Sequence, residues 1–338
     1  MIPHNLPTIG IEEEEAALRV LRSKQLSQDQ EVKFFENEFC DYLGLPHGSA
    51  VALSSGTSSL FLALKILNAK EKHVLFPGYV CSALRHAVSL AGGIEKTVDI
   101  TTNSPNIDMK IVEKISPDIS IIPHMYGIPI KLDVENTLVI EDCCQALGAK
   151  VNKKMVGLHG DVGIFSFYAT KLMTSGGQGG MFVSQNQEYV HAVKDFREFD
   201  YRNDTKTRFN FKMTDLQAAI GREQLKKLPN FLKRREEIFQ YYKKAGLDLL
   251  DILEEQRNFL EPVRFRAIIK TPNPKEIIES LNSIDVKAIV PTEDWELLGS
   301  QKSFPNGLKL SHETVSIPIY PSLTDDDLDH ILSGIIKK

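Results

Sequence analysis

Long apolar runs are missing from this sequence, and none approaches the length that a helix needs to cross a bilayer. The amino-terminal stretch MIPHNLPTIGIEEEE has no apolar centre and is acidic, unlike a secretory signal. These two absences predict a cytoplasmic protein with no membrane partner.

Cysteine is also scarce, and the 338 residues contain four: Cys40, Cys81, Cys143 and Cys144. Cys143 and Cys144 are adjacent and cannot easily pair with each other, and no C-x-x-C spacing is present for zinc. A disulfide framework is therefore not expected, and a reducing compartment is favoured. Because no cluster of metal-ligating residues is recognisable either, no metal is predicted.

The sequence also lacks an excess of basic over acidic residues. Forty Lys and Arg stand against 45 Asp and Glu, which gives a formal net charge of −5. This balance argues against a general nucleic-acid binder, for which a basic domain is expected. The hydrophobic fraction of 42% and the charged fraction of 25% are ordinary for a globular protein. The length suffices for a large α/β domain plus a smaller one.

The residues that suggest chemistry are concentrated in the stretch 138–181. Short apolar runs at 138–140 and 162–168 predict buried strands. Asp142 and Lys171 follow these strands, at the ends where open α/β sheets bind ligands. A carboxylate and an amine in these places suit a cofactor with a basic ring nitrogen and an aldehyde. Pyridoxal 5′-phosphate (PLP) is such a cofactor, with Lys171 as its Schiff-base lysine and Asp142 as the partner of its pyridinium nitrogen.

Each of these residues also has a plainer interpretation. Most lysines are solvated surface groups, although Lys171 ends an apolar and aromatic strand. Asp142 could form a salt bridge or cap a helix. His124 follows a predicted strand at 119–123 and could reach the same site, but most such histidines are structural.

A second candidate feature is the turn after a short strand at 50–53. The sequence Ser54-Ser55-Gly56-Thr57-Ser58-Ser59 leads there into a helical run at 60–67. A strand, a Gly/Ser turn and a helix in this order direct free backbone N–H groups at an anion. The alternative is an ordinary capped helix start.

Periodicity elsewhere predicts helices over 11–22, 30–42, 216–242 and 324–336. A break or kink is expected at Pro229 within the third of them. In the carboxyl-terminal part, strands are predicted over 263–270 and 286–290.

The amino-acid sequence around Asp142 and Lys171 resembles that of a known family. E-D-C-C-Q-A-L-G-A at 141–149 and G-D-V-G-I-F-S-F-Y-A-T-K at 160–171 resemble the nucleotide-sugar aminotransferase (DegT/StrS) family of fold-type I PLP enzymes. The resemblance implies an aspartate aminotransferase-like α/β fold. It consists of a large PLP-binding domain with a mostly parallel mixed sheet and an N-terminal arm (1–235), and a smaller C-terminal α+β domain (236–338). The resemblance is weak over 245–310.

The resemblance also implies further cofactor contacts. The S-G-T turn and a serine before the lysine would bind the phosphate, a glutamine would lie near the ring oxygen, and an asparagine would reach the phosphate of the neighbouring subunit's cofactor. The matching residues are Gly56, Thr57, Ser58, Ser166, Gln145 and Asn210. A homodimer with shared active sites follows from the last of these.

Three departures from the family pattern stand out. The usual ring-stacking aromatic is replaced by Cys81, so either this thiol covers the ring, or Tyr79 reaches in, or Cys81 is a buried helix residue. The glycine cluster K-L-M-T-S-G-G-Q-G-G (171–180) has one extra residue, for which we expect a different turn with no change of role. The family's Arg and P-L-H stretch is not clearly present near 291–295.

By this resemblance the chain is a PLP-dependent transaminase. It would move an amino group from glutamate or glutamine to a keto sugar, foremost a nucleotide-linked keto-deoxy sugar, in aminosugar and polysaccharide biosynthesis. A sugar dehydratase of the same family usually has histidine at the position of Lys171. Two further alternatives are a PLP enzyme acting on a non-nucleotide ketone such as a keto cyclitol, and a non-catalytic PLP-binding regulator.

Overall fold

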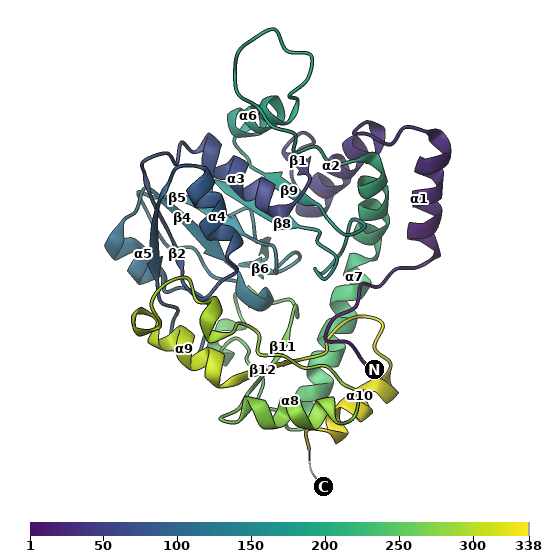
Figure 1. The fold of residues 1–338 in the computed structure, drawn as a ribbon, viewed down its shortest axis with the longest axis vertical. Coiled ribbons are helices and arrows are strands. Elements are labelled where there is room, and N and C mark those ends of the chain that lie inside the picture. Colours follow the sequence, from purple (N-terminus) through teal and green to yellow (C-terminus); the bar gives the residue numbers. More distant parts are fainter. Residues whose placement is uncertain (337–338) are drawn as a thin grey trace.

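A seven-stranded sheet forms the centre of the computed structural model, which describes residues 1–336 (Figure 1). Its strands lie in the order β1 (Ala50–Leu53), β9 (Gly180–Val183), β8 (Val162–Ser166), β5 (Leu138–Asp142), β4 (Ile119–Pro123), β2 (His73–Pro77) and β3 (Ile94–Val98). The pairs β5–β8, β4–β5, β2–β4 and β2–β3 are parallel, whereas β9 runs antiparallel to both β1 and β8. The predicted α/β fold with a mostly parallel mixed sheet is confirmed.

Burial explains why the sheet forms from these segments. The residues of β1, β4 and β9 are buried throughout, as expected of strands that are covered on both faces. The covering helices are α2 (Gln30–Leu43), α3 (Gly56–Ile66), α4 (Ala83–Leu90), α5 (Met109–Ile115) and α6 (Gln187–Arg197). The N-terminal helix α1 (Ile11–Ser23) packs on the long helix α7 (Asp215–Lys244) at the edge of this layer (Figure 1).

Helix α7 connects the two largest hydrophobic cores of the described residues. It runs through Pro229 as one helix of 30 residues, so the predicted break is wrong and the alternative, a kink, stays a prediction. Leu225 and Leu228 are buried in the core of the central sheet, and Phe239 and Tyr242 in a second core. Tertiary packing on both sides of the proline therefore outweighs the loss of one backbone hydrogen bond.

The second core is built from the carboxyl-terminal part of the chain. There β11 (Ala267–Lys270) pairs antiparallel with β12 (Thr314–Ile317), beside α8 (Pro274–Asn282) and α10 (Asp325–Ser333). The predicted strand at 286–290 is wrong, because only single bridges form there, from Val286 to Ile2 and from Ile289 to Ser316. The predicted domain boundary at 235 falls inside α7 and stays a prediction.

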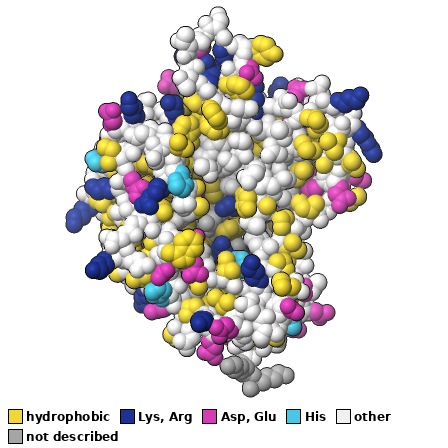
Figure 2. Space-filling view, in the orientation of Figure 1, with side chains coloured by type: hydrophobic (Ala, Val, Ile, Leu, Met, Phe, Trp, Pro, Cys, Tyr) yellow, Lys and Arg dark blue, Asp and Glu magenta, His cyan; other side chains and the backbone are white. Residues whose placement is uncertain are grey.

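The remaining elements join the two parts. Two short strands of the large part, β6 (Lys150–Val151) and β7 (Lys154–Met155), form a small sheet with β10 (Leu260–Glu261). Helix α9 (Pro305–His312) begins where the Asp99 carboxylate accepts hydrogen bonds from the backbone N–H groups of Asn306 and Gly307, at 2.7 and 3.0 Å. The space-filling view shows a hollow in the middle of the face between the two parts, with cationic and histidine side chains at its bottom (Figure 2). No helix of residues 1–336 combines the length and the apolar character required to cross a membrane.

Candidate active site

One cavity of about 240 Å³ opens at the carboxyl ends of β4, β5 and β8 and at the amino end of α3. Seven of the nine residues predicted for the site line it: Gly56, Thr57, Cys81, Asp142, Gln145, Ser166 and Lys171. Among the described residues that line this cavity, Asp142 is the only carboxylate and Lys171 the only lysine or arginine. The structure therefore brings together side chains that lie up to 115 positions apart in the sequence.

The turn before α3 is held by a capping box. Ser55 accepts a hydrogen bond from the Ser58 N–H at 3.0 Å, and the Ser58 hydroxyl accepts one from the Ser55 N–H at 2.9 Å. Ser58 is thus engaged inside the turn and does not line the cavity. The N–H groups of Gly56 and Thr57 belong to the first helical turn, where no intrahelical acceptor exists, so they can bind an anion.

Gly56 brings this turn into contact with β8. A Cβ added to Gly56 would lie 2.8 Å from the Ser166 Cβ and 3.2 Å from the Cys144 Sγ. Because a side chain at this position would displace both neighbours, glycine is what lets the helix amino end and the Ser166 hydroxyl share one wall of the cavity. A hydroxyl beside free backbone N–H groups forms a cradle suited to a phosphate.

Asp142 ends β5 as a buried carboxylate, 8% exposed. Its Oδ1 accepts a hydrogen bond from the Cys144 N–H at 3.0 Å, and the Cys144 thiol is a second donor. Burial, with the charge of Asp142 next, holds the pKa of the Cys144 thiol well above its usual range, so the thiol keeps its proton. Both partners of Asp142 are therefore neutral, which leaves a buried negative charge beside the cavity that a bound cation would balance.

Lys171 lies in a tight loop after β8. Its backbone N–H donates to the Tyr168 carbonyl at 2.9 Å, and the Asn5 side chain of the N-terminal arm donates to the neighbouring Thr170 carbonyl at 2.9 Å. The Nζ atom is 5.3 Å from the centre of the Phe265 ring. The amine is held against an aromatic ring rather than a carboxylate, so it remains available for covalent chemistry.

Gln145 lines the cavity, and the backbone of Tyr126 holds its side chain. The Tyr126 N–H donates to Gln145 Oε1 at 2.8 Å, which leaves the amide nitrogen of Gln145 as the donor for a ligand. Tyr126 has φ = 59°, an uncommon backbone conformation for an aromatic residue, and such conformations cluster at functional sites.

The structure decides between the interpretations of Cys81. Tyr79 is fully buried and its hydroxyl bonds to the Tyr126 hydroxyl at 2.8 Å, so it does not reach the cavity. Cys81 is exposed, lines the cavity and precedes α4, so the interpretation as a buried helix residue is wrong. Its contact with a cofactor ring stays a prediction.

His124 lines the cavity, but both ring nitrogens are occupied. Nδ1 accepts a hydrogen bond from the Ile130 N–H at 3.1 Å, so Nε2 carries the proton and donates to Glu141 at 3.0 Å. Glu141 also accepts from the N–H groups of His159 and Gly160, at 2.6 and 2.8 Å. His124 is a structural group that ties the ends of β4 and β5 together.

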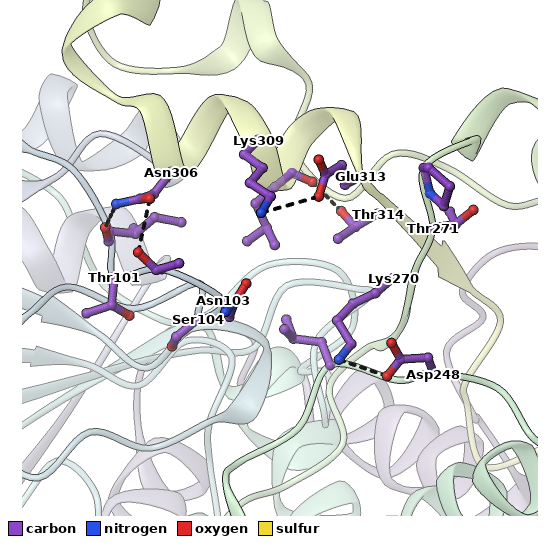
Figure 3. A pocket seen from close by; sticks show the side chains of 15 residues that line it. Thr101, Asn103, Ser104, Asp248, Lys270, Thr271, Asn306, Lys309, Glu313 and Thr314 are labelled. Carbon is purple, nitrogen blue, oxygen red and sulfur yellow. Dashed lines mark hydrogen bonds and ion pairs between the residues drawn. The ribbon is translucent and has the colours of Figure 1, made fainter.

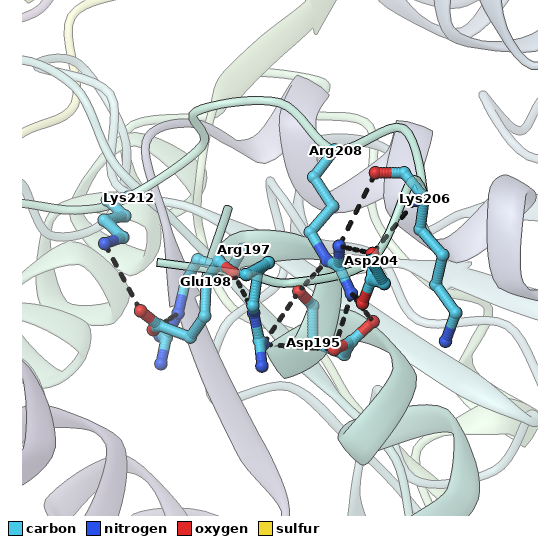
Figure 4. A network of polar contacts seen from close by, with 8 residues as sticks. Asp195, Arg197, Glu198, Asp204, Lys206, Arg208 and Lys212 are labelled. Carbon is cyan, nitrogen blue, oxygen red and sulfur yellow. Dashed lines mark hydrogen bonds and ion pairs between the residues drawn. The ribbon is translucent and has the colours of Figure 1, made fainter. Parts of the chain in front are cut away.

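Asn210 lies outside the cavity of its own chain, in the segment between α6 and α7 that projects from the body (Figure 1). Ion pairs hold this segment: Arg208 contacts Asp195 at 3.0 Å and Asp204 at 2.7 Å, and Lys212 contacts Glu198 at 3.3 Å (Figure 4). The Phe211 carbonyl accepts from the Ser54 N–H at 2.8 Å, which anchors the segment at the turn before α3. The exposed Asn210 can therefore reach a neighbouring molecule.

A second cavity, of about 310 Å³, lies between the loop 100–104 and α9 (Figure 3). Its two lysines are already paired, Lys270 with Asp248 at 2.8 Å and Lys309 with Glu313 at 3.8 Å. We therefore assign the chemistry to the cavity that contains Lys171.

Cys144, which lines the main cavity, and Tyr126, which holds Gln145 there, were not predicted from the sequence. Cys144 follows Asp142 by two positions, and this spacing, which lets a backbone N–H return to the carboxylate, could have indicated it. Tyr126 owes its place to its backbone conformation, for which the sequence gives no signal.

Comparison with known proteins adds independent information. Residues 7–336 match the model of the DegT/DnrJ/EryC1/StrS aminotransferase family. The chain is 28% identical over 377 aligned residues to the spore coat polysaccharide biosynthesis protein SpsC of Bacillus subtilis, covering 99% of this chain and 96% of SpsC. It is 31% identical over 330 residues to GDP-perosamine synthase of Caulobacter vibrioides, covering 89% and 88% of the two chains.

A solved structure shows the same fold. Spr1654 of Streptococcus pneumoniae in its PMP form superposes with a TM-score of 0.89 at 20% identity, covering 99% of this chain and 98% of that one. Its PLP form gives a TM-score of 0.88.

Proposed function

Because the chain belongs to the DegT/DnrJ/EryC1/StrS aminotransferase family, whose members depend on PLP, we propose that it aminates a nucleotide-linked keto-deoxy sugar with glutamate or glutamine as donor. The observation that supports this most is the cavity in which, among residues 1–336, Lys171 is the only lysine and Asp142 the only carboxylate. Relatives named for aminosugar synthesis and for polysaccharide biosynthesis support a sugar acceptor.

The residues present fit PLP. The amino end of α3 and Ser166 would hold the phosphate, Asp142 the ring nitrogen, and Lys171 the carbonyl carbon. Gln145 would donate to the ring oxygen, and Cys81 would cover the ring. When bound, PLP supplies the electron sink that makes the Cα–H bond of an amino acid breakable.

The protein's own side chains would control the protons and complete the phosphate site. Asp142 keeps a proton on the cationic ring nitrogen beside it, because a buried carboxylate stabilises the protonated form. The Lys171 amine, which lines the cavity, moves the proton at the donor's Cα. The partner molecule's Asn210 would complete the phosphate site, so that a homodimer contains two shared sites.

An absorbance experiment tests the function. Glutamate or glutamine added to the yellow purified protein should bleach the cofactor band, and a nucleotide-linked keto sugar should then restore it. If only a keto cyclitol restored the band, the amino acceptor would be a non-nucleotide ketone. No bleaching with any amino donor would favour a non-catalytic PLP-binding regulator instead.

Thiol labelling tests the position of Cys81. In the cofactor-free protein, one thiol per chain should react quickly with a colorimetric disulfide reagent, because Cys81 is exposed while Cys40 and Cys143 are buried and the Cys144 pKa is raised. Cofactor binding should slow this reaction about tenfold or more, since thiol reactivity requires access. Cys81→Ala should remove the fast phase. An unchanged rate in the cofactor-loaded protein would show that Cys81 does not cover the ring.

Mixed dimers test the sharing of sites. Lys171→Ala and Asn210→Ala subunits, each weakly active alone, should regain about a quarter of the wild-type rate when mixed and allowed to exchange. Half of the dimers are then mixed, and each mixed dimer has one intact site. As a control, Lys171→Ala mixed with the double variant should regain nothing. If the first mixture also stays inactive although Asn210→Ala alone is impaired, Asn210 acts within its own chain.

A further inference from the structure

Trp295 is the single tryptophan of the chain, and its side chain is 77% exposed. It lies in the short 3₁₀ turn Asp294–Glu296, between α8 and α9. Tryptophan is highly buried on average, because its ring is large and apolar. An indole that faces solvent next to a binding cavity offers a stacking surface for a flat ring of the ligand.

The amino-terminal end of this turn is attached to the wall of the active-site cavity. The Thr292 hydroxyl lies 3.1 Å from the Tyr126 hydroxyl, and the Tyr126 backbone holds Gln145 in the cavity. Thr292 and the Tyr126 side chain are both buried, so this attachment is part of the folded core. Consecutive Cα atoms are about 3.8 Å apart, so the Cα atom of Trp295 lies within about 11 Å of that of Thr292.

The carboxyl-terminal end of the turn is attached to the same wall. The Leu298 N–H donates to the Gly78 carbonyl at 2.9 Å, and Gly78 leads into Val80 and Cys81, which line the cavity. Trp295 itself does not line the cavity. The indole is therefore held outside the cavity but next to it.

The turn between these two attachments is also held internally. The Glu296 carboxylate accepts a hydrogen bond from the Glu293 N–H at 2.8 Å. His312 Nε2 lies 3.2 Å from the Asp294 carboxylate, which fixes the turn to α9. The position of Trp295 is thus determined by its neighbours, and little conformational freedom remains to be lost when a ligand stacks on it.

Negative charge surrounds the indole. Glu293, Asp294 and Glu296 flank Trp295 in the sequence, and burial, followed by the charges of Glu296 and Asp294, raises the pKa of Glu293. Figure 2 shows hydrophobic and acidic side chains next to one another at the edge of the central hollow. Because like charges repel, these carboxylates disfavour a phosphate group at the turn. They can accept hydrogen bonds from the N–H groups of a neutral ring.

We propose that Trp295 stacks on the nucleobase of the nucleotide-linked acceptor. This inference rests on the proposed function, in which the keto carbon comes to Lys171 inside the cavity. The base is the part of such a substrate furthest from the keto carbon, so it lies outside the cavity, where Trp295 is held. A base is flat and uncharged, which suits an indole flanked by carboxylates, whereas the diphosphate does not.

Fluorescence tests the contact directly, because the chain has a single tryptophan. Cofactor-loaded enzyme is titrated with GDP, UDP and dTDP and excited at a wavelength that the nucleotides do not absorb. The nucleotide that the acceptor carries should quench the emission saturably. Pyrophosphate and methyl glucoside, which carry no base, should leave the emission unchanged.

Variants separate stacking from a structural role. Trp295→Ala should weaken binding of the quenching nucleotide about tenfold or more, the effect expected of losing one base stack. The KM for the keto sugar should rise with kcat unchanged, because the stack is equally present in the ground state and the transition state. Bleaching by the amino donor and the Tm should stay as in the wild type.

Two further variants serve as controls. Trp295→Phe should recover most of the nucleotide affinity, since it keeps an aromatic ring. Leu253 is another exposed apolar residue, 59% exposed, and Leu253→Ala should change neither nucleotide binding nor KM.

Absence of quenching by all three nucleotides, or equal quenching by pyrophosphate, would overturn the inference. So would unchanged nucleotide affinity in Trp295→Ala, or an emission maximum typical of a buried indole in the nucleotide-free enzyme, which would mean that another subunit covers Trp295. Failure of the proposed function looks different: no amino donor would bleach the wild-type cofactor band, or only a non-nucleotide ketone would restore it.

Discussion

Replacing Lys171 with alanine is expected to reduce turnover about 10⁴-fold or more, because this substitution removes both the covalent attachment point and the base. No other lysine or arginine of the described part of the chain lines the cavity and could take over. The phosphate cradle at α3 and Ser166 does not involve Lys171, so the variant should still bind PLP. The measurements are steady-state transamination and the cofactor content after desalting.

Lys171→Arg is the matched control for charge. It keeps a cation next to the Phe265 ring but offers no amine for a Schiff base, so it should be as inactive as the alanine variant. If either variant kept substantial transamination, another group would have to hold the cofactor. A variant that loses both PLP and its folded structure would be uninformative about catalysis, so the Tm is measured alongside.

Replacing Asp142 with asparagine is expected to lower kcat about 100-fold to 1,000-fold, the range typical of removing one preorganised electrostatic partner. Asparagine keeps the shape and can still accept the Cys144 N–H hydrogen bond, but it carries no charge to stabilise a proton on the ring nitrogen. The loss should grow as the pH rises, because the uncompensated ring nitrogen then loses its proton. The pH profile of kcat and of the cofactor absorbance checks this.

Glu141 offers the control, since it is the adjacent carboxylate and is also buried. Glu141→Gln should lower the Tm, because its side chain accepts hydrogen bonds from His124 and from two backbone N–H groups. Its pH profile should stay like that of the wild type. If Asp142→Asn and Glu141→Gln gave the same profile, the special role of Asp142 would be contradicted.

Much of this arrangement was predictable because it depends on local patterns. The apolar runs before Asp142 and Lys171 indicated buried strands, and the parallel order of β4, β5 and β8 places the strand ends at one edge of the sheet. The Gly/Ser turn after β1 indicated an anion cradle at a helix start. All of these signals lie within about ten residues of the side chains that they position.

The predictions that failed depended on distant contacts. Pro229 does not break α7, because packing in two separate cores holds the helix on both sides. The segment 286–290 forms only two single bridges, and both pair it with distant parts of the chain: Val286 with Ile2 and Ile289 with Ser316.

The most direct test of the central claim is to find where the cofactor is attached. The purified, PLP-saturated protein is reduced with borohydride, which makes the link between PLP and its lysine permanent, and is then digested and analysed by mass spectrometry. We expect the cofactor on the peptide that contains Lys171 and on no other, with none attached in Lys171→Ala. Attachment to a different lysine, or no attachment in a protein that still transaminates, would contradict the assignment of Lys171 and of the site built around it.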